Sequence, residues 1–361
     1  MSSQVLIYQL ESSAGLYSEF FCILNTYIYC VVHGFHFQLD SSRWMYRYWK
    51  GWEDYFYPIQ SPSLSSSSLP PINIHHGMIL GFYSLYQHRA TYPTLYRLLP
   101  WIKNQVLRTM EDLQLIPGQF GSIFIRRGDK MIRESKFISS EKYLCRLLKE
   151  YAECHTVFLQ TDDYNAYEEL QDYIQKKDLA IRLVTLCEPQ YRGGMMIYNR
   201  EHAHLDKMVT CPHNENQDFF KKNKNRFHES VSIENHSADE KRKHMSTFLV
   251  GIEIICRYSV YCTSDFQSNV SRFIKLHHSN PQRVINILNQ YPEPLDHDLI
   301  EPWNSWRPLQ PGSNSNQLTN LFDQKKHNSN SCVTPSSFKT QPRSAFNIRV
   351  PVKFLPRENK S

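Results

Sequence analysis

From residue 121 onward, short apolar runs alternate with segments in which apolar residues recur at helical spacing. The runs at 122–126, 155–160, 180–186 and 259–263 predict strands, and the segments at 140–151, 167–175, 245–257 and 269–277 predict helices. Strands that alternate with helices across short turns form a parallel sheet with helices on both faces. The pattern therefore predicts an α/β protein with a Rossmann-like C-terminal lobe.

A shorter α/β pattern precedes this lobe. Strands are predicted at 5–8 and 35–39, a helix at 16–29, and further helical periodicity at 92–115. A chain of 361 residues has room for two or three domains. We expect an N-terminal α/β lobe at 1–115, a Rossmann-like lobe at 116–300 with a polar insertion at 190–244, and a Ser/Asn/Pro-rich tail at 301–361 that is largely disordered.

The composition favours a globular protein with an anionic ligand. The formal charge is 41 − 35 = +6, which a basic pocket can account for without nucleic acid. Nine scattered cysteines without a C-x-x-C pair indicate reduced thiols. No signal-peptide pattern is present, and the most apolar stretch, 20–32, is shorter than the roughly 20 residues that span a bilayer. These features predict a cytoplasmic protein, or one in the secretory-pathway lumen if the chain is truncated.

The most informative segment, FIRRGDKMIRE at 124–134, follows an apolar strand. Its charged residues are Arg126, Arg127, Asp129, Lys130, Arg133 and Glu134. These residues leave the carboxyl edge of a parallel sheet, where open α/β folds bind ligands. Arginine can bind a diphosphate bidentately, and lysine adds charge. The alternative is an ordinary strand end held by salt bridges.

Two later segments leave the same predicted sheet. Thr161, Asp162 and Asp163 end the next strand, where the acids could bind a metal, orient the arginines or accept hydrogen bonds from sugar hydroxyls. Either acid could instead only cap the following helix. Ser268 and Asn269 stand at a predicted helix start, whose backbone N–H groups and dipole favour phosphate. By itself, this is also what an ordinary helix cap looks like.

Together these segments resemble the α-1,6-fucosyltransferase superfamily, which includes core, nodulation and protein O-fucosyltransferases. The family's H-x-R-R-x-D-K motif, with a glutamate four residues after the lysine, matches Arg126, Arg127, Asp129, Lys130 and Glu134. Its A-T-D-D strand end is similar to 160–163, and its S-S-Q/N-V-x-R stretch to 267–272. The glycine-bearing loop before its first helix resembles 15–19, and its N-W-R-Y…G-W-E…F region resembles 39–56.

The resemblance implies a GT-B-like two-lobed glycosyltransferase that inverts the sugar, needs no metal or other cofactor, and transfers fucose from GDP-fucose to a glycan or protein hydroxyl. The N-terminal lobe would face the acceptor and the Rossmann-like lobe the donor. Glu134 would be the catalytic base and Lys130 its partner. The implied donor-binding residues are Arg126, Arg127, Asp129, Asp162, Asp163, Ser268, Asn269 and Gly15.

Two departures from the family pattern keep other functions open. Phe124 stands where the family has a histidine, and Gly251 where it has an aspartate, and both positions help that family to recognise guanine. Glu253 could compensate only if its helix were rotated or shifted. The alternatives are a nucleotide- or glycan-binding protein of the same fold without turnover, and a transferase that uses another nucleotide sugar.

Three further groups of residues have a structural interpretation that competes with a functional one. Histidines 75, 76, 202, 204 and 213 match no metal-site spacing and suit solvated loops. The aromatic residues at 44–56 could stack on a sugar, but such clusters more often form a core between domains. The basic run at 221–226 is typical of a solvated surface.

Overall fold

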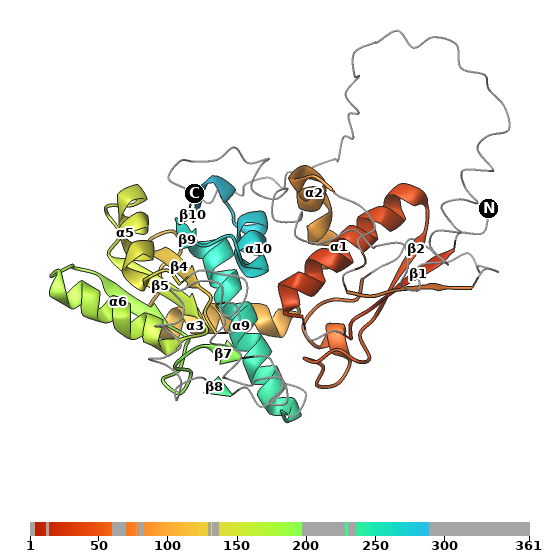
Figure 1. Cartoon of the computed structure of the whole chain (residues 1–361), viewed down its shortest axis with the longest axis horizontal. Helices are drawn as coiled ribbons and strands as arrows, with labels where there is room; N and C mark the ends of the chain where they lie inside the picture. Colours follow the sequence, from red (N-terminus) through yellow and green to blue (C-terminus); the bar gives the residue numbers. More distant parts are fainter. Residues whose placement is uncertain are drawn as a thin grey trace, which may run out of the picture. The chain divides into compact units, whose positions relative to one another are not determined.

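The computed structural model describes residues 4–11, 14–59, 70–76, 78, 83–128, 131, 137–196, 228–229 and 236–288. All of these residues belong to one compact unit, 1–308. The unit contains a three-stranded and a five-stranded parallel sheet, together with a short two-stranded pair (Figure 1). Among the described residues, no helix has the length and apolarity that a membrane crossing requires.

The three-stranded sheet belongs to the N-terminal part of the chain. It contains β1 (Val5–Gln9), β2 (His36–Asp40) and β3 (Ile72–Ile74) in the parallel order β2-β1-β3. Helix α1 (Leu16–His33) connects β1 to β2 and ends at Gly34, whose φ of 70° lies in the left-handed region that glycine adopts readily. The predicted strand–helix–strand unit is confirmed. The three residues of β3 are too few to show a sequence period.

The helical periodicity expected at 92–115 corresponds to two helices, α2 (Leu85–Leu95) and α3 (Pro100–Asp112). Ser84 begins α2 with a capping box in which Gln87 participates. The chain leaves helical geometry after α2, and Pro100 takes the first position of α3, where a missing N–H costs nothing. Helix α3 packs on the later helix α9 and so joins the two parts of the unit.

The five-stranded sheet confirms the Rossmann-like prediction. It contains β4 (Gly121–Ile125), β5 (Thr156–Thr161), β6 (Arg182–Thr185), β9 (Cys262–Ser264) and β10 (Val284–Asn286). All pairings are parallel, in the order β10-β9-β4-β5-β6. The sequence analysis did not predict β10, again a strand of only three residues. Strand β9 begins at Cys262, later than the expected 259–263 strand.

Helices cover both faces of this sheet. They are α5 (Ser140–Glu150), α6 (Tyr164–Lys176), α9 (Ala238–Tyr258) and α10 (Asn269–His277). Helices α5 and α6 bury a core with Ile123, Ile125 and Leu159 (Figure 1). On the opposite face, α9 lies against β5, where the glycine at 251 touches Gln160. Alternate residues of each strand therefore face different helices.

The predicted insertion at 190–244 ends too late. Helix α9 already begins at Ala238, because Ser237 and Glu240 form a capping box there. The first turns of α9 are polar and lack the apolar spacing that marks its buried part. The short pair β7 (Met195–Met196) and β8 (His228–Glu229) also lies inside the predicted insertion.

Candidate functional site

Polar residues follow three neighbouring strands at the carboxyl edge of the five-stranded sheet. Ile125 of β4 pairs with Thr161 of β5, and Phe124 pairs with Ser264 of β9. The residues that come next along these three strands are Arg126, Asp162 and Asp265. Parallel strands end at the same edge, so three chemistry-bearing segments of the sequence meet there.

Arg126 is held at this edge by Asp162. Its guanidinium donates to the Asp162 carboxylate, which also accepts the backbone N–H of Arg127 at 2.7 Å. Both side chains of the ion pair are 14% exposed. Asp162 therefore orients the guanidinium, as expected of an acid that organises the site.

Arg127 points into the protein instead. Its guanidinium is 1% exposed and donates to Asp163 at 3.0 Å, to Glu169 at 2.6 Å and to Ser140 at 2.9 Å. A donor molecule could reach it only by breaking these bonds. These contacts match the salt-bridged strand end that the sequence left open, and donor binding by Arg127 stays a prediction from the motif.

The pKa shifts of Arg127 and Glu169 show how strongly these two groups interact. Burial opposes the charged form of Arg127, but hydrogen bonds and charge from Glu169 and Asp163 outweigh it and raise the arginine pKa. Burial likewise acts to raise the Glu169 pKa, yet Arg127 and Ser140 lower it below its ordinary value. Arg127 and Glu169 therefore stabilise each other's charge, whereas burial raises the pKa of Asp163 despite the nearby Arg127.

Asp163 caps helix α6. It is fully buried and accepts the backbone N–H groups of Asn165 at 3.0 Å and Gly193 at 2.7 Å, in addition to its bond with Arg127. These contacts match the helix cap that the sequence left open, and a role of Asp163 toward the donor stays a prediction. Of the two neighbouring acids, Asp162 alone stands beside Arg126.

The start of α10 lies where the sequence predicts it. Ser268 is the N-cap, and its hydroxyl accepts the Val270 N–H at 3.2 Å. Asn269 is the first helical residue, and its amide oxygen accepts from Arg272 at 3.0 Å. Asp265 ties the preceding loop by accepting the Gln267 N–H at 2.9 Å. The positive end of the helix dipole thus opens near the edge that carries Arg126.

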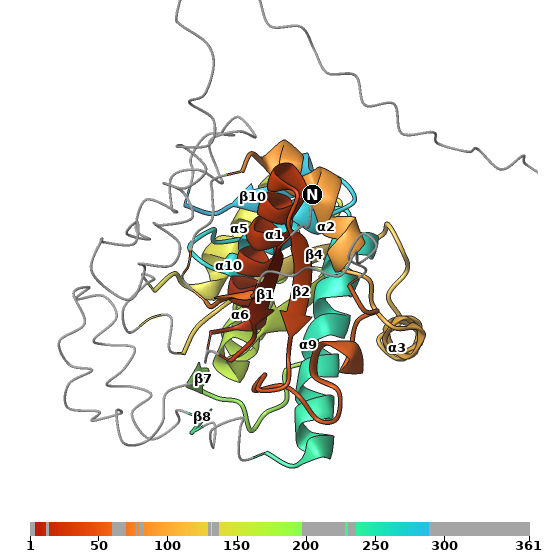
Figure 2. The same cartoon turned by 90° about the vertical axis from the view of Figure 1, so that its right-hand side faces the viewer.

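Gly15 brings the N-terminal part of the chain to the same region. It is the residue before α1, and a Cβ added to it would meet no atom within 4 Å. Two residues later, Tyr17 stacks on Phe273 of α10 with ring centroids 4.1 Å apart. Gly15 therefore borders open space at the N-terminus of α1. Helix α1 itself packs beside α10 (Figure 2).

Gln160 is a site residue that the sequence analysis did not single out. It lies one residue before the end of β5 and is 7% exposed, and its Oε1 is buried without a hydrogen-bond partner. A Cβ at Gly251 would stand 1.9 Å from this oxygen. The carboxamide therefore fills the space that any side chain at 251 would need. The signal in the sequence was a glycine inside an otherwise apolar helix.

Glu253 does not take over the position of Gly251. Its carboxylate oxygen lies 2.7 Å from the His277 Nε2, at hydrogen-bond distance, and 3.7 Å from Arg257. Glu253 is thus engaged with α10 and with its own helix, and nothing in these contacts directs it toward Gln160.

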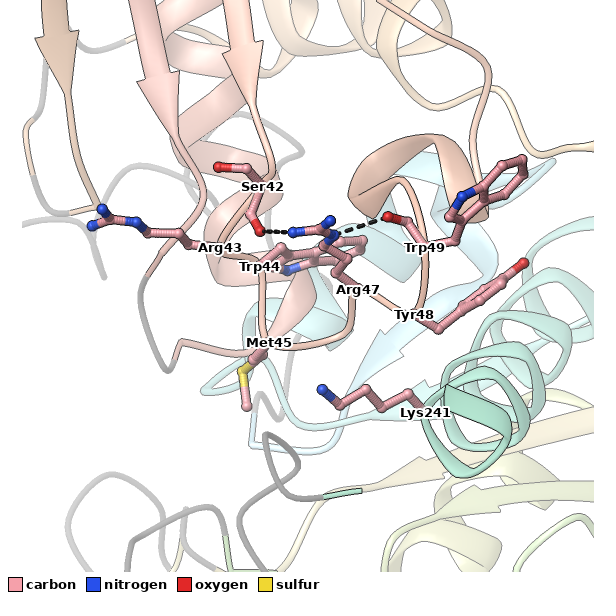
Figure 3. A pocket seen from close by; sticks show the side chains of 8 residues that line it. All are labelled: Ser42, Arg43, Trp44, Met45, Arg47, Tyr48, Trp49 and Lys241. Carbon is pink, nitrogen blue, oxygen red and sulfur yellow. Dashed lines mark hydrogen bonds between the residues drawn. The ribbon is translucent and has the colours of Figure 1, made fainter. Parts of the chain in front are cut away.

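Most of the aromatic cluster at 44–56 is core, as the structural interpretation predicts. Trp44, Trp52 and Phe56 are at most 2% exposed, and the last two stack at 4.1 Å. Trp49 is the exception, with 68% of its surface exposed. It borders a pocket between this loop and Lys241 at the N-terminal part of α9 (Figure 3).

Several predicted residues lie outside the described part of the chain. They are Asp129, Lys130, Glu134, the histidines at 202, 204 and 213, and the basic run at 221–226. His75 and His76 are described, and their ring nitrogens lie 2.9 Å from Glu11 and 3.4 Å from Glu19 respectively. Within the described ranges, no three His, Cys, Asp or Glu residues gather in a way that could hold a metal ion.

The fold and this site define an α/β chain with charged and polar groups at the carboxyl edge of a parallel sheet. No family model and no curated protein matches the sequence. Among solved structures, the chain is similar to NodZ α-1,6-fucosyltransferase soaked with GDP-fucose, at 10% identity and a TM-score of 0.47, over 79% of this chain and 94% of that one. Fucosyltransferase NodZ from Bradyrhizobium gives 9% identity and a TM-score of 0.48, over 79% and 96%.

Proposed function

We propose that this chain is a glycosyltransferase that transfers a sugar from a nucleoside diphosphate sugar to an acceptor hydroxyl. The observation that supports this most is the convergence of Arg126 and the N-terminus of α10 on one sheet edge. A guanidinium and the positive end of a helix dipole are both suited to a diphosphate. Asp162 fixes the guanidinium before any ligand arrives.

These groups suit the leaving group in particular. When the sugar departs, negative charge grows on the diphosphate, and donors already in place stabilise that charge more in the transition state than in the ground state. Arg126 would bind the phosphate, while Ser268 and Asn269 would present the start of α10. Gly15 would leave room for the donor beside α1.

The other half of the reaction is assigned through the motif resemblance. Glu134 would take the proton from the acceptor hydroxyl, with Lys130 as its partner, and attack from the opposite face would invert the sugar. The proposed donor is GDP-fucose, and the proposed acceptor is a glycan or protein hydroxyl. No step requires a metal ion, because the arginine and the helix terminus supply the positive charge.

A nucleotide panel followed by a transfer assay tests this function. GDP, UDP, ADP and CDP are compared by thermal shift, and GDP-fucose is then assayed for hydrolysis and for transfer to glycan acceptors. We expect binding and turnover that persist after dialysis against EDTA, and loss of turnover in a Glu134→Ala variant. Normal activity in that variant would exclude Glu134 as the base, and loss of activity with EDTA would exclude metal independence.

Two other functions remain candidates. One is a nucleotide- or glycan-binding protein without turnover, and the other is a transferase that uses a different nucleotide sugar. Gln160 favours them, because a neutral carboxamide fills the place beside Gly251 where the family carries an acid. Calorimetry separates the possibilities. Glycan binding without GDP binding would support a binding protein, whereas preference for another nucleotide would identify the other donor.

A further inference from the structure

A pocket of about 480 Å³ lies between the loop that follows β2 and the N-terminal part of α9 (Figure 3). It is lined by Ser42, Arg43, Trp44, Met45, Arg47, Tyr48, Trp49 and Lys241. Its volume is in the range of small-molecule sites. Three of its lining residues are cations, and none is an acid.

The positive charge of the pocket is only weakly neutralised. Arg47 donates to the backbone oxygens of Ser42 and Trp49, and has no carboxylate partner among the described residues. The ammonium group of Lys241 forms no hydrogen bond or ion pair with the part of the chain that the structure describes. Arg43 pairs with Glu11 across 3.4 Å, but the arginine side chain is 80% exposed. Such an exposed pair contributes little energy.

The nearest buried carboxylate is committed to the loop itself. Asp54 is 3% exposed and accepts four backbone N–H groups, those of residues 48, 49, 50 and 51, at 2.7–3.0 Å. These bonds hold the loop in shape, so Asp54 does not neutralise Arg47 or Lys241. The Trp44 indole N–H is also buried and has no acceptor among the described residues. The pocket lining therefore has more hydrogen-bond donors than acceptors available to them.

Trp49 adds an exposed aromatic ring at one end of the pocket, and Figure 3 shows its indole pointing away from Arg47 and Lys241. It is 68% exposed, and Lys50 lies over its ring at 4.4 Å from the centroid. Exposed tryptophan faces stack well on planar or ring-shaped ligands, including sugars. An exposed tryptophan together with cations that lack a carboxylate partner suits a sugar ring that carries an anionic oxygen group.

We propose that this pocket binds a carbohydrate bearing a carboxylate, sulfate or phosphate group. The oxyanion would lie near Lys241 and Arg47, and a sugar ring would stack on Trp49. The three anionic groups share one chemistry, a compact set of acceptor oxygens. The residues that line this pocket are different from those assigned to the sheet-edge site.

Titration calorimetry with a matched set of probes tests the proposal on the full chain. The probes are a uronic-acid disaccharide and its neutral methyl ester, a 6-sulfated and a 6-phosphorylated monosaccharide, inorganic phosphate, and a short single-stranded DNA. We expect at least one acidic sugar to bind more tightly than the neutral ester, with an affinity that falls as salt increases. Equal affinity for acid and ester, or no binding of any sugar at millimolar concentration, would overturn the proposal.

Three variants locate the binding. Lys241→Gln should weaken the acidic sugar about threefold or more, the scale of one exposed charge pair. Lys103→Gln, on the exposed side of α3, is the matched control and should change nothing. Trp49→Ala should weaken the acidic sugar but not inorganic phosphate. Unchanged sugar affinity in both pocket variants, or tighter binding of DNA than of every sugar, would overturn the assignment.

Discussion

Two consecutive arginines leave β4 and meet two consecutive aspartates that leave β5, yet the two ion pairs occupy different environments. Arg126 and Asp162 stand at the sheet edge with 14% of each side chain exposed. Arg127 and Asp163 are 1% and 0% exposed, and Arg127 also contacts the buried Ser140 and the partly exposed Glu169. One step along an extended chain reverses the side-chain direction, so neighbouring residues of one type serve different purposes.

The difference predicts that Arg127 supports stability. An Arg127→Met substitution would leave Asp163 buried without its cation, and we expect the free energy of unfolding to fall by about 3–5 kcal/mol. Denaturant unfolding followed by circular dichroism measures this change. A loss below about 1 kcal/mol would show that the buried pair is no more important to the fold than a surface one.

Arg126 should show the opposite behaviour. In an Arg126→Met variant we expect turnover of the nucleotide sugar to fall about 10²–10³-fold, the scale of one lost transition-state donor. The free energy of unfolding should change by no more than about 1 kcal/mol, because the ion pair is partly exposed. Steady-state kinetics and unfolding are measured on the same preparation. Similar stability losses in both arginine variants would abolish the distinction between them.

Gln160 tests how far the binding region extends beyond Arg126. A Gln160→Leu variant removes a buried amide oxygen that has no hydrogen-bond partner among the described residues, so the free energy of unfolding should not decrease. If the amide binds the base, nucleoside diphosphates should bind about fivefold more weakly, which is the effect of one hydrogen bond. Inorganic pyrophosphate should bind as before. Equal losses for pyrophosphate and nucleotide would contradict a role for Gln160 at the base.

Acid should weaken the contact between Arg127 and Glu169. The pKa of Glu169 is held below its ordinary 4.5 by Arg127 and Ser140, against the effect of burial. This stabilisation is therefore present above the unfolded-state pKa and is lost as pH falls through the folded-state pKa. We expect the wild-type protein to lose stability more steeply below pH 4.5 than Glu169→Gln does. If wild type and Glu169→Gln lose thermal stability in parallel as the pH falls, the pair formed by Glu169 and Arg127 does not contribute to stability in this way.

The sequence was sufficient for the parallel sheets, because each long strand and its following helix show a clear period. It also placed Ser268 and Asn269 at a helix start. The strands β3 and β10 were not predicted, because three residues are too few to show the alternation of apolar and polar residues that marks a strand. The different roles of Arg126 and Arg127 were equally hidden, since the direction of each side chain depends on where the strand ends and on a glutamate 42 positions away.

Glycine at 251 constrains how this chain can change over generations. An acidic residue introduced there alone would collide with the Gln160 carboxamide, so the variant would be penalised before it gained any new contact. A smaller residue at 160 has to come first, or both codons must mutate together. Related chains should therefore carry either glycine at 251 with glutamine at 160, or a larger residue at 251 with a smaller one at 160. Large side chains at both positions should be rare.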